Sequence, residues 1–166
     1  MLFNTIKLKN YSKVMVEYAA AAALYPGQLL ELTSSGTVQK HSGAGKTALP
    51  MFAVEDELQG KGITEAYAAG DVVQCWIPGR GDEVYVKLAD AENVVIGDRL
   101  ESNGLGFVRK VVRTNESWES ADSQQAKSQY DHHIVGIALE AQDLSTLEGS
   151  ESSLEANSQF IKMRVI

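Results

Sequence analysis

The stretch Gly27–Lys40 reads GQLLELTSSGTVQK, and Gly97–Lys110 reads GDRLESNGLGFVRK. The two align without gaps at an offset of 70 residues, and six of the 14 positions are identical. The identical pairs are Gly27/Gly97, Leu30/Leu100, Glu31/Glu101, Gly36/Gly106, Val38/Val108 and Lys40/Lys110. Each copy runs turn glycine, apolar run, turn glycine, apolar run, which is the pattern of a β-hairpin. The repeat predicts one hairpin unit used twice, although shared turn chemistry alone could also make two hairpins look alike.

A looser match follows each hairpin, because Phe52–Glu55 resembles Ile137–Glu140 and both carry Ala-aliphatic-Glu. Each half of the chain is therefore expected to contain a hairpin, a loop and a further strand. Repetition of such a unit predicts a small β-barrel or β-sandwich with pseudo-symmetry.

Other short apolar runs separated by turn residues indicate more strands. The expected strands are Gln28–Leu32, Val72–Ile77, Val84–Leu88, Phe107–Val112, Ile134–Leu139 and Phe160–Ile166. Ile6–Lys9 also alternates apolar and basic residues. Helix signals are weak: Glu17–Leu24 has good helix formers but no amphipathic face, so it is a single turn or an extended linker. The fold class is mainly β.

Composition excludes several function classes. The chain has 166 residues, with 15 Lys+Arg against 22 Asp+Glu, and a net charge of −7. This balance argues against a nucleic-acid partner, which requires a basic face. No apolar run approaches the ~20 residues that a membrane span needs. The single cysteine, Cys75, forms no internal disulfide, which agrees with folding in a reducing cytoplasm.

The expected domain organisation is an N-terminal arm, residues 1–18, followed by a single β domain, residues 19–166. Two stretches within that domain, 114–131 and 140–159, are rich in Ser, Gln and acidic residues. They lack the apolar content of a core and are expected to be surface excursions.

No motif indicates catalysis. Gly43–Thr47 resembles a phosphate loop but lacks the first glycine of that pattern, and Pro50 follows. Arg80–Asp82 matches an adhesion tripeptide but is more simply a turn. His132 and His133 are adjacent, so on a strand they face opposite sides and do not share a metal ion. The sequence predicts no enzyme activity, no cofactor and no metal.

The order of these elements resembles the head decoration (capsid cement) proteins of tailed bacteriophages. The resemblance covers Pro26 to Ala141. It is carried by Pro26-Gly27 to Lys40, Ala53–Asp56, Ala69–Val73, Val84–Leu88, Ile96-Gly97 to Val108, and Val135–Ala141. The longer stretches 114–131 and 140–159 depart from the family pattern.

The resemblance implies a β-barrel or β-tulip-like domain, often a homotrimer, made in the host bacterial cytoplasm and bound to the outer surface of the virion capsid. It would stabilise the expanded capsid by clamping neighbouring major capsid subunits, with no chemistry required. In such proteins an N-terminal arm often makes the capsid contact, and adding a strand to an exposed sheet edge is one physical way in which it could bind. The candidate contact residues are Leu2, Phe3, Ile6, Leu8, Val14, Val16 and Trp118.

The sequence leaves alternatives open for the contact residues and for the function. Residues 1–18 could instead contain an ordinary first strand of the barrel, and Trp118 could anchor a loop on its own domain. The function could instead be a virion-surface glycan- or receptor-binding module. A small trimeric all-β nucleotide hydrolase fits the size and class but has no matching motif.

Overall fold

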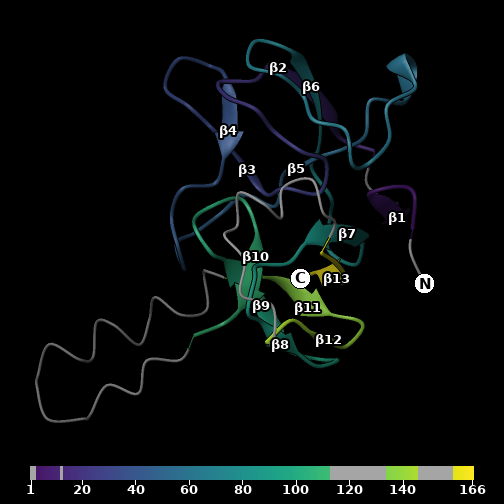
Figure 1. The fold of residues 1–166 in the computed structure, drawn as a ribbon, viewed down its shortest axis with the longest axis vertical. Coiled ribbons are helices and arrows are strands. Elements are labelled where there is room, and N and C mark those ends of the chain that lie inside the picture. Colours follow the sequence, from purple (N-terminus) through teal and green to yellow (C-terminus); the bar gives the residue numbers. More distant parts are fainter. Residues whose placement is uncertain (1–2, 12, 113–133, 146–158) are drawn as a thin grey trace, which may run out of the picture.

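The computed structural model describes residues 3–11, 13–112, 134–145 and 159–166 (Figure 1). Strands and glycine turns make up this part of the chain, with one 3-10 helix, η1 (Glu57–Gln59). The predicted mainly β class is confirmed.

The strands fall into two consecutive groups along the chain. The first group is β1 (Lys7–Lys9), β2 (Met15–Ala19), β3 (Leu30–Leu32), β4 (Val38–Lys40), β5 (Phe52–Ala53) and β6 (Val72–Trp76). The second is β7 (Glu83–Lys87), β8 (Asn93–Val94), β9 (Arg99–Ser102), β10 (Val108–Lys110), β11 (Ile134–Ala138), β12 (Gln142–Asp143) and β13 (Phe160–Val165). They form a six-stranded sheet of order β1-β7-β13-β11-β9-β10, a three-stranded sheet β2-β6-β5, and the pairs β3-β4 and β8-β12.

The repeated sequence forms the same hairpin twice, in the same register. In β3–β4, Leu30 lies opposite Lys40, and in β9–β10 Leu100 lies opposite Lys110. These pairs are related by the 70-residue offset that the sequence shows. Gly27 and Gly97, which open the two copies, both have positive φ, 82° and 92°. Glycine adopts this conformation without the Cβ strain of other residues, which explains its place at both turns.

The duplication extends beyond the hairpins, to the looser match. The Gly27 N–H donates to the Ala53 carbonyl, and the Gly97 N–H donates to the Ala138 carbonyl. In both halves the strand with this alanine pairs with a following strand, β5 with β6 and β11 with β13. That strand in turn pairs with the first strand of the half, β6 with β2 and β13 with β7. We call residues 15–76 unit 1 and residues 83–165 unit 2.

Neither unit closes into a barrel. The strand order of each sheet in the described chain is open. One parallel bridge per unit brings the first strand against the hairpin, Ala20 with Val38 and Leu88 with Val108. A single bridge stands in each unit where a closed barrel requires a continuous ladder of hydrogen bonds. The barrel prediction is therefore corrected to two open β units, while the small β domain holds.

Two hydrophobic cores hold the units. The smaller core belongs to unit 1 and includes Leu30, Val38 and Cys75. The larger core combines Leu29 and Trp76 of unit 1 with residues of unit 2. Burying each such large apolar side chain contributes about 1.5–3 kcal/mol. Because the larger core draws on both units, unit 2 packs on unit 1 as one body.

Two stretches differ from their sequence interpretation. The Ala-rich run 17–24 begins inside strand β2 rather than forming a turn or linker. At the start of the expected excursion 140–159, Gln142–Asp143 forms β12 and Leu144 is buried, so these residues pack on the domain. The other expected excursion, 114–131, lies outside the described residues.

Candidate interaction sites

The predicted arm residues nearest the N-terminus pack on the chain itself. Ile6 is fully buried in the larger core, and its N–H donates to the buried carboxylate of Glu55 at 3.1 Å. Phe3 and Leu8 pack against the same core. β1 then pairs with β7 of unit 2. These residues lie in and beside the edge strand of the open six-stranded sheet, and Ile6 is not accessible to a partner.

The remaining candidates divide between surface and core. Val14 is 51% exposed, whereas Val16 is half-buried against the unit 1 core. Leu2 and Trp118 lie outside the described residues, so their contacts remain predictions. Of the predicted contact residues placed by the structure, Val14 presents the most accessible apolar side chain.

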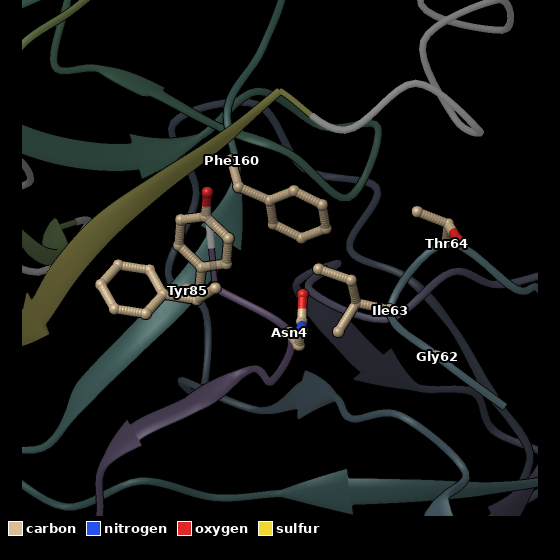
Figure 2. A pocket seen from close by; sticks show the side chains of 7 residues that line it. Asn4, Gly62, Ile63, Thr64, Tyr85 and Phe160 are labelled. Atoms are coloured by element: carbon tan, nitrogen blue, oxygen red, sulfur yellow. The ribbon is translucent and has the colours of Figure 1, made fainter. Parts of the chain in front are cut away.

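A small pocket lies beside Phe3, with a volume of about 280 Å³. It is lined by Phe3, Asn4, Gly62, Ile63, Thr64, Tyr85 and Phe160. The Tyr85 ring stacks on Phe160 at 4.8 Å and meets the edge of Phe3 at 5.1 Å between ring centroids. Figure 2 shows the rings of Tyr85 and Phe160, with Ile63 close to the Phe160 ring. The pocket therefore combines aromatic walls with the short polar side chains of Asn4 and Thr64.

This pocket suits a small neutral or apolar group. Its volume is at the lower limit of small-molecule sites, about 300 Å³. Burial raises the pKa of Tyr85, and the nearby Glu140 charge raises it further, so the phenol stays neutral. No acid or base lines the pocket. A single side chain or one sugar ring fits these properties, and general acid–base chemistry does not.

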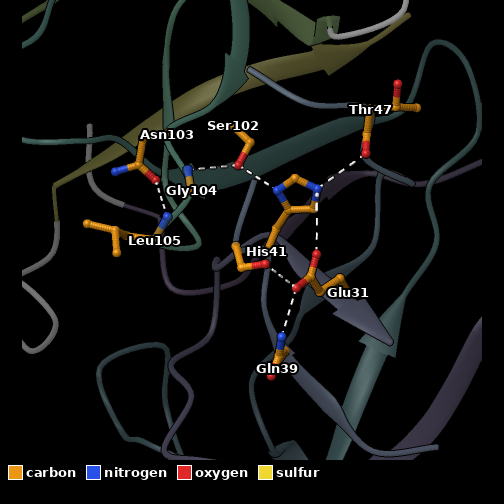
Figure 3. Close-up of polar contacts among 9 residues, drawn as sticks. Glu31, Gln39, His41, Thr47, Ser102, Asn103, Gly104 and Leu105 are labelled. Atoms are coloured by element: carbon orange, nitrogen blue, oxygen red, sulfur yellow. Dashed lines mark hydrogen bonds and ion pairs between the residues drawn. The ribbon is translucent and has the colours of Figure 1, made fainter. Parts of the chain in front are cut away.

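Apart from this pocket, a cluster of polar side chains joins the two repeated hairpins (Figure 3). His41 follows β4 of the first hairpin, and its Nδ1 lies 2.8 Å from the Ser102 hydroxyl at the end of β9. His41 Nε2 lies 3.3 Å from the Thr47 carbonyl and 3.8 Å from the Glu31 carboxylate. Burial alone would raise the pKa of Glu31, but hydrogen bonds from Gln39 and Ser42 lower it below its usual value. Glu31 is therefore a charged acceptor at neutral pH.

The order Glu31, His41, Ser102 resembles a catalytic triad, but its geometry does not serve a nucleophile. Ser102 is fully buried, and its oxygen also accepts the Gly104 N–H at 3.1 Å. With Nδ1 accepting the Ser102 proton, the Nε2–H donates to the Thr47 carbonyl, so both ring nitrogens have partners. Gly45 N–H also donates to the Ser102 carbonyl across the same junction. The cluster is a structural joint between the hairpins.

Other motifs noted in the sequence are turns. Asp82 of the Arg80–Asp82 tripeptide is fully buried, and its carboxylate accepts the N–H groups of Tyr11 and Gly79. Gly43 accepts the Lys46 N–H within a tight turn. His132 and His133 fall outside the described ranges. Within those ranges, no group of three or more His, Cys, Asp or Glu side chains is arranged to hold a metal ion. Nor does any helix there have the length and apolarity to cross a membrane.

No protein-family model matches the chain, and no curated protein matches it in sequence. Among solved structures, the fold is similar to the "N base" of head fiber gp8.5 in bacteriophage phi29, with a TM-score of 0.52. The match covers 92% of this chain and 93% of that chain, at 11% sequence identity. The fold resembles a phage head-fiber base. At this identity the likeness concerns the fold, and it extends across both units.

The pocket and the hairpin joint were not predicted from sequence. Tyr85 and Phe160 are 75 residues apart in the chain, and only the β7–β13 pairing brings them together. The partial signal for the joint was His41, which directly follows the first repeat. His41 would have pointed to Ser102 only if the packing of one hairpin on the other had been known.

Proposed function

We propose that this chain is a non-enzymatic structural protein of a tailed-phage virion, bound to the outer surface of the capsid. The observation that carries the proposal is the fold likeness to a phage head-fiber base across both units. The order of turns and strands that resembles head decoration proteins is consistent with this class. The buried Ser102 and the uncharged pocket walls agree with a role in binding rather than catalysis.

The finer proposal is that the protein clamps neighbouring major capsid subunits as a homotrimer. The two units share one hydrophobic core, so the domain is stiff. A stiff domain suits a protein that holds neighbouring capsid subunits together. Closed three-fold symmetry would give each trimer several contacts with the capsid at once, and linked weak contacts reinforce one another. The net charge of −7 keeps an abundant exterior protein soluble.

Purified particles from cells that carry the gene provide the test. The protein is expected in them by mass spectrometry and on their exterior by immunogold labelling. Saturating protein added to particles that lack it should raise their rupture temperature. Particles that contain no trace of the chain would overturn the virion assignment. Bound protein that leaves rupture unchanged would overturn only the clamping role.

A matched pair of variants tests the N-terminal contact. Val14 and Val95 are 51% and 52% exposed, and Val95 lies in the turn before the second repeat. Val14→Asp should weaken capsid binding about tenfold or more, whereas Val95→Asp should not. Equal effects of the two substitutions would exclude a specific role for Val14.

The aromatic pocket favours a second candidate function, recognition of a glycan on a host surface. Aromatic rings beside hydroxyl and amide groups bind sugar rings through stacking and hydrogen bonds. A glycan array probed with the intact protein should show hits that Ile63→Trp abolishes by filling the pocket. An array without hits would exclude this function and leave the capsid role untouched.

A further inference from the structure

The duplication makes a comparison of sheet edges possible. In unit 2, the outer edge of β7 is covered. The Tyr85 N–H donates to the Ile6 carbonyl of the β1 segment, and the Lys87 N–H donates to the Gly27 carbonyl, both at 2.9 Å. These donors face away from β13, the other neighbour of β7. Unit 2 thus has its first strand paired on both sides.

The equivalent strand of unit 1 is β2, and its outer edge is open. β2 is the end strand of the order β2-β6-β5. At the two ends of the β2–β6 pairing, the Ile77 N–H donates to the Val14 carbonyl and the Ala20 N–H donates to the Asp71 carbonyl. Because backbone groups alternate in direction along an antiparallel strand, those of Val16 and Tyr18 also face β6. The groups of Met15, Glu17 and Ala19 therefore point to the open edge.

No described residue occupies this edge. Met15, Glu17 and Ala19 are exposed, and within the described part of the chain their outward N–H and C=O groups have no hydrogen-bond partner. Glu17 corresponds to Tyr85, which the β1 segment covers in unit 2. An edge strand with free donors and acceptors is a template for pairing with another strand.

We propose that the β2 edge binds an extended strand of a partner protein by β-augmentation. The site is the backbone of Met15, Glu17 and Ala19, and it is the unit 1 counterpart of the β1 site on β7. This inference rests on the internal symmetry of the fold and does not depend on the capsid role.

The chemistry of the partner strand follows from the side chains of β2. Val16 and Tyr18 are half-buried against the unit 1 core, so apolar residues at alternate positions of the incoming strand would extend that core. On the other face Glu17 is exposed, and the chain carries a net charge of −7. Basic residues at the intervening positions complement this charge. β1 has the same pattern, with Ile6 and Leu8 alternating with Lys7 and Lys9.

A second copy of this chain fits the edge less well. Two β2 strands paired about a two-fold axis through the middle of the strand would place Glu17 directly opposite Glu17. Like charges in that position destabilise a sheet. The proposed occupant is therefore a basic, alternating strand from a different protein.

A synthetic peptide of the β1 sequence, residues 4–10 (Asn-Thr-Ile-Lys-Leu-Lys-Asn), is the probe. It should bind the intact protein with saturable shifts in a ¹⁵N NMR titration. The amides of Met15, Glu17 and Ala19 should become protected from hydrogen exchange. The β7 edge should not bind the peptide, because β1 of the same chain already occupies that edge at a high effective concentration. A peptide with Pro at the Leu8 position is the control and should not bind.

Variants of Glu17 separate edge pairing from general attraction. Glu17→Pro removes an N–H that faces away from β6, and proline is tolerated at that side of an edge strand. It should weaken peptide binding about tenfold, which is the worth of one hydrogen bond. Glu17→Lys keeps the fold and should weaken it through charge. Glu57→Lys on η1 changes the net charge equally and should have little effect.

Several results would overturn the proposal. They are absence of saturable binding, protection at Tyr85 in place of Glu17, and equal weakening by Glu17→Lys and Glu57→Lys. Sedimentation showing that the free protein self-associates, and that Glu17→Gln strengthens this association by removing the Glu17–Glu17 repulsion, would assign the edge to a second copy instead.

Discussion

The two opening glycines of the repeats allow steric crowding to be separated from backbone strain. Gly27 and Gly97 have φ values of 82° and 92°, so alanine at either position meets the same left-handed conformation. That strain costs about 1–2 kcal/mol. A Cβ on Gly27 would lie 2.5 Å from Cε1 of Phe160, whereas a Cβ on Gly97 meets nothing within 4 Å. Phe160 is buried and stacks on Tyr85, so its ring has little room to move.

Overpacking of this kind adds about 1–3 kcal/mol. We expect Gly97→Ala to cost about 1–2 kcal/mol of the free energy of unfolding, and Gly27→Ala about 2–5 kcal/mol. The effect of alanine on the entropy of the unfolded chain is the same at both positions and cancels in the comparison.

Urea unfolding followed by circular dichroism measures the difference, as a lower midpoint at an unchanged slope. A Phe160→Leu background should relieve part of the Gly27→Ala cost and none of the Gly97→Ala cost. Equal costs for the two glycines, or no relief in the Phe160→Leu background, would refute the steric account of the unit junction.

Three further predictions concern single side chains. Burial raises the pKa of Cys75 to about 12, so the native protein should not react with a thiol reagent at pH 8, and labelling should begin only as urea unfolds it. Hydrogen bonds from Arg164 and Lys162 hold the pKa of Glu83 below its ordinary 4.5, so this carboxylate stabilises the fold above that pH. The stability lost in Glu83→Gln, about 1 kcal/mol at pH 7, should shrink as the pH falls below 4.5 and vanish once the native carboxyl is protonated. Trp76→Ala should cost about 3–5 kcal/mol in thermal or urea unfolding, because Trp76 is fully buried in the core that both units share.

Local features of the fold could be predicted where the sequence repeats itself. The matched glycines and the identical Leu and Lys positions predicted both hairpins, and the structure has Leu30 opposite Lys40 and Leu100 opposite Lys110. The prediction succeeded because turn geometry sets the register of a hairpin locally. It also carried the looser alanine match, since Ala53 and Ala138 make equivalent hydrogen bonds.

Long-range features could not be predicted in the same way. Strand β2 was not predicted because the alanine-rich run 17–24 carries only weak local signals, whereas pairing with β6 decides the conformation of residues 15–19. Nothing in Ile6–Lys9 indicates that its partner is β7, more than 70 residues away. Without knowledge of that pairing, residues 1–18 could be interpreted as an arm. The pocket beside Tyr85 depends on it too, because Phe3 enters with the same segment.

The order of strands along the chain also sets an order of assembly during translation. All strands of unit 1 lie within residues 15–76, so its sheet and the smaller core can form as soon as that stretch leaves the ribosome. Unit 2 cannot do so, because β13 lies between β7 and β11 and is synthesised last. Until β13 emerges, Leu29 and Trp76 lack the β13 side of the larger core, and β1 has no completed sheet to join. The nascent chain therefore carries an incomplete apolar face from the synthesis of β7 until that of β13, and transiently exposed apolar surface of this kind is prone to aggregate and is a target of chaperones.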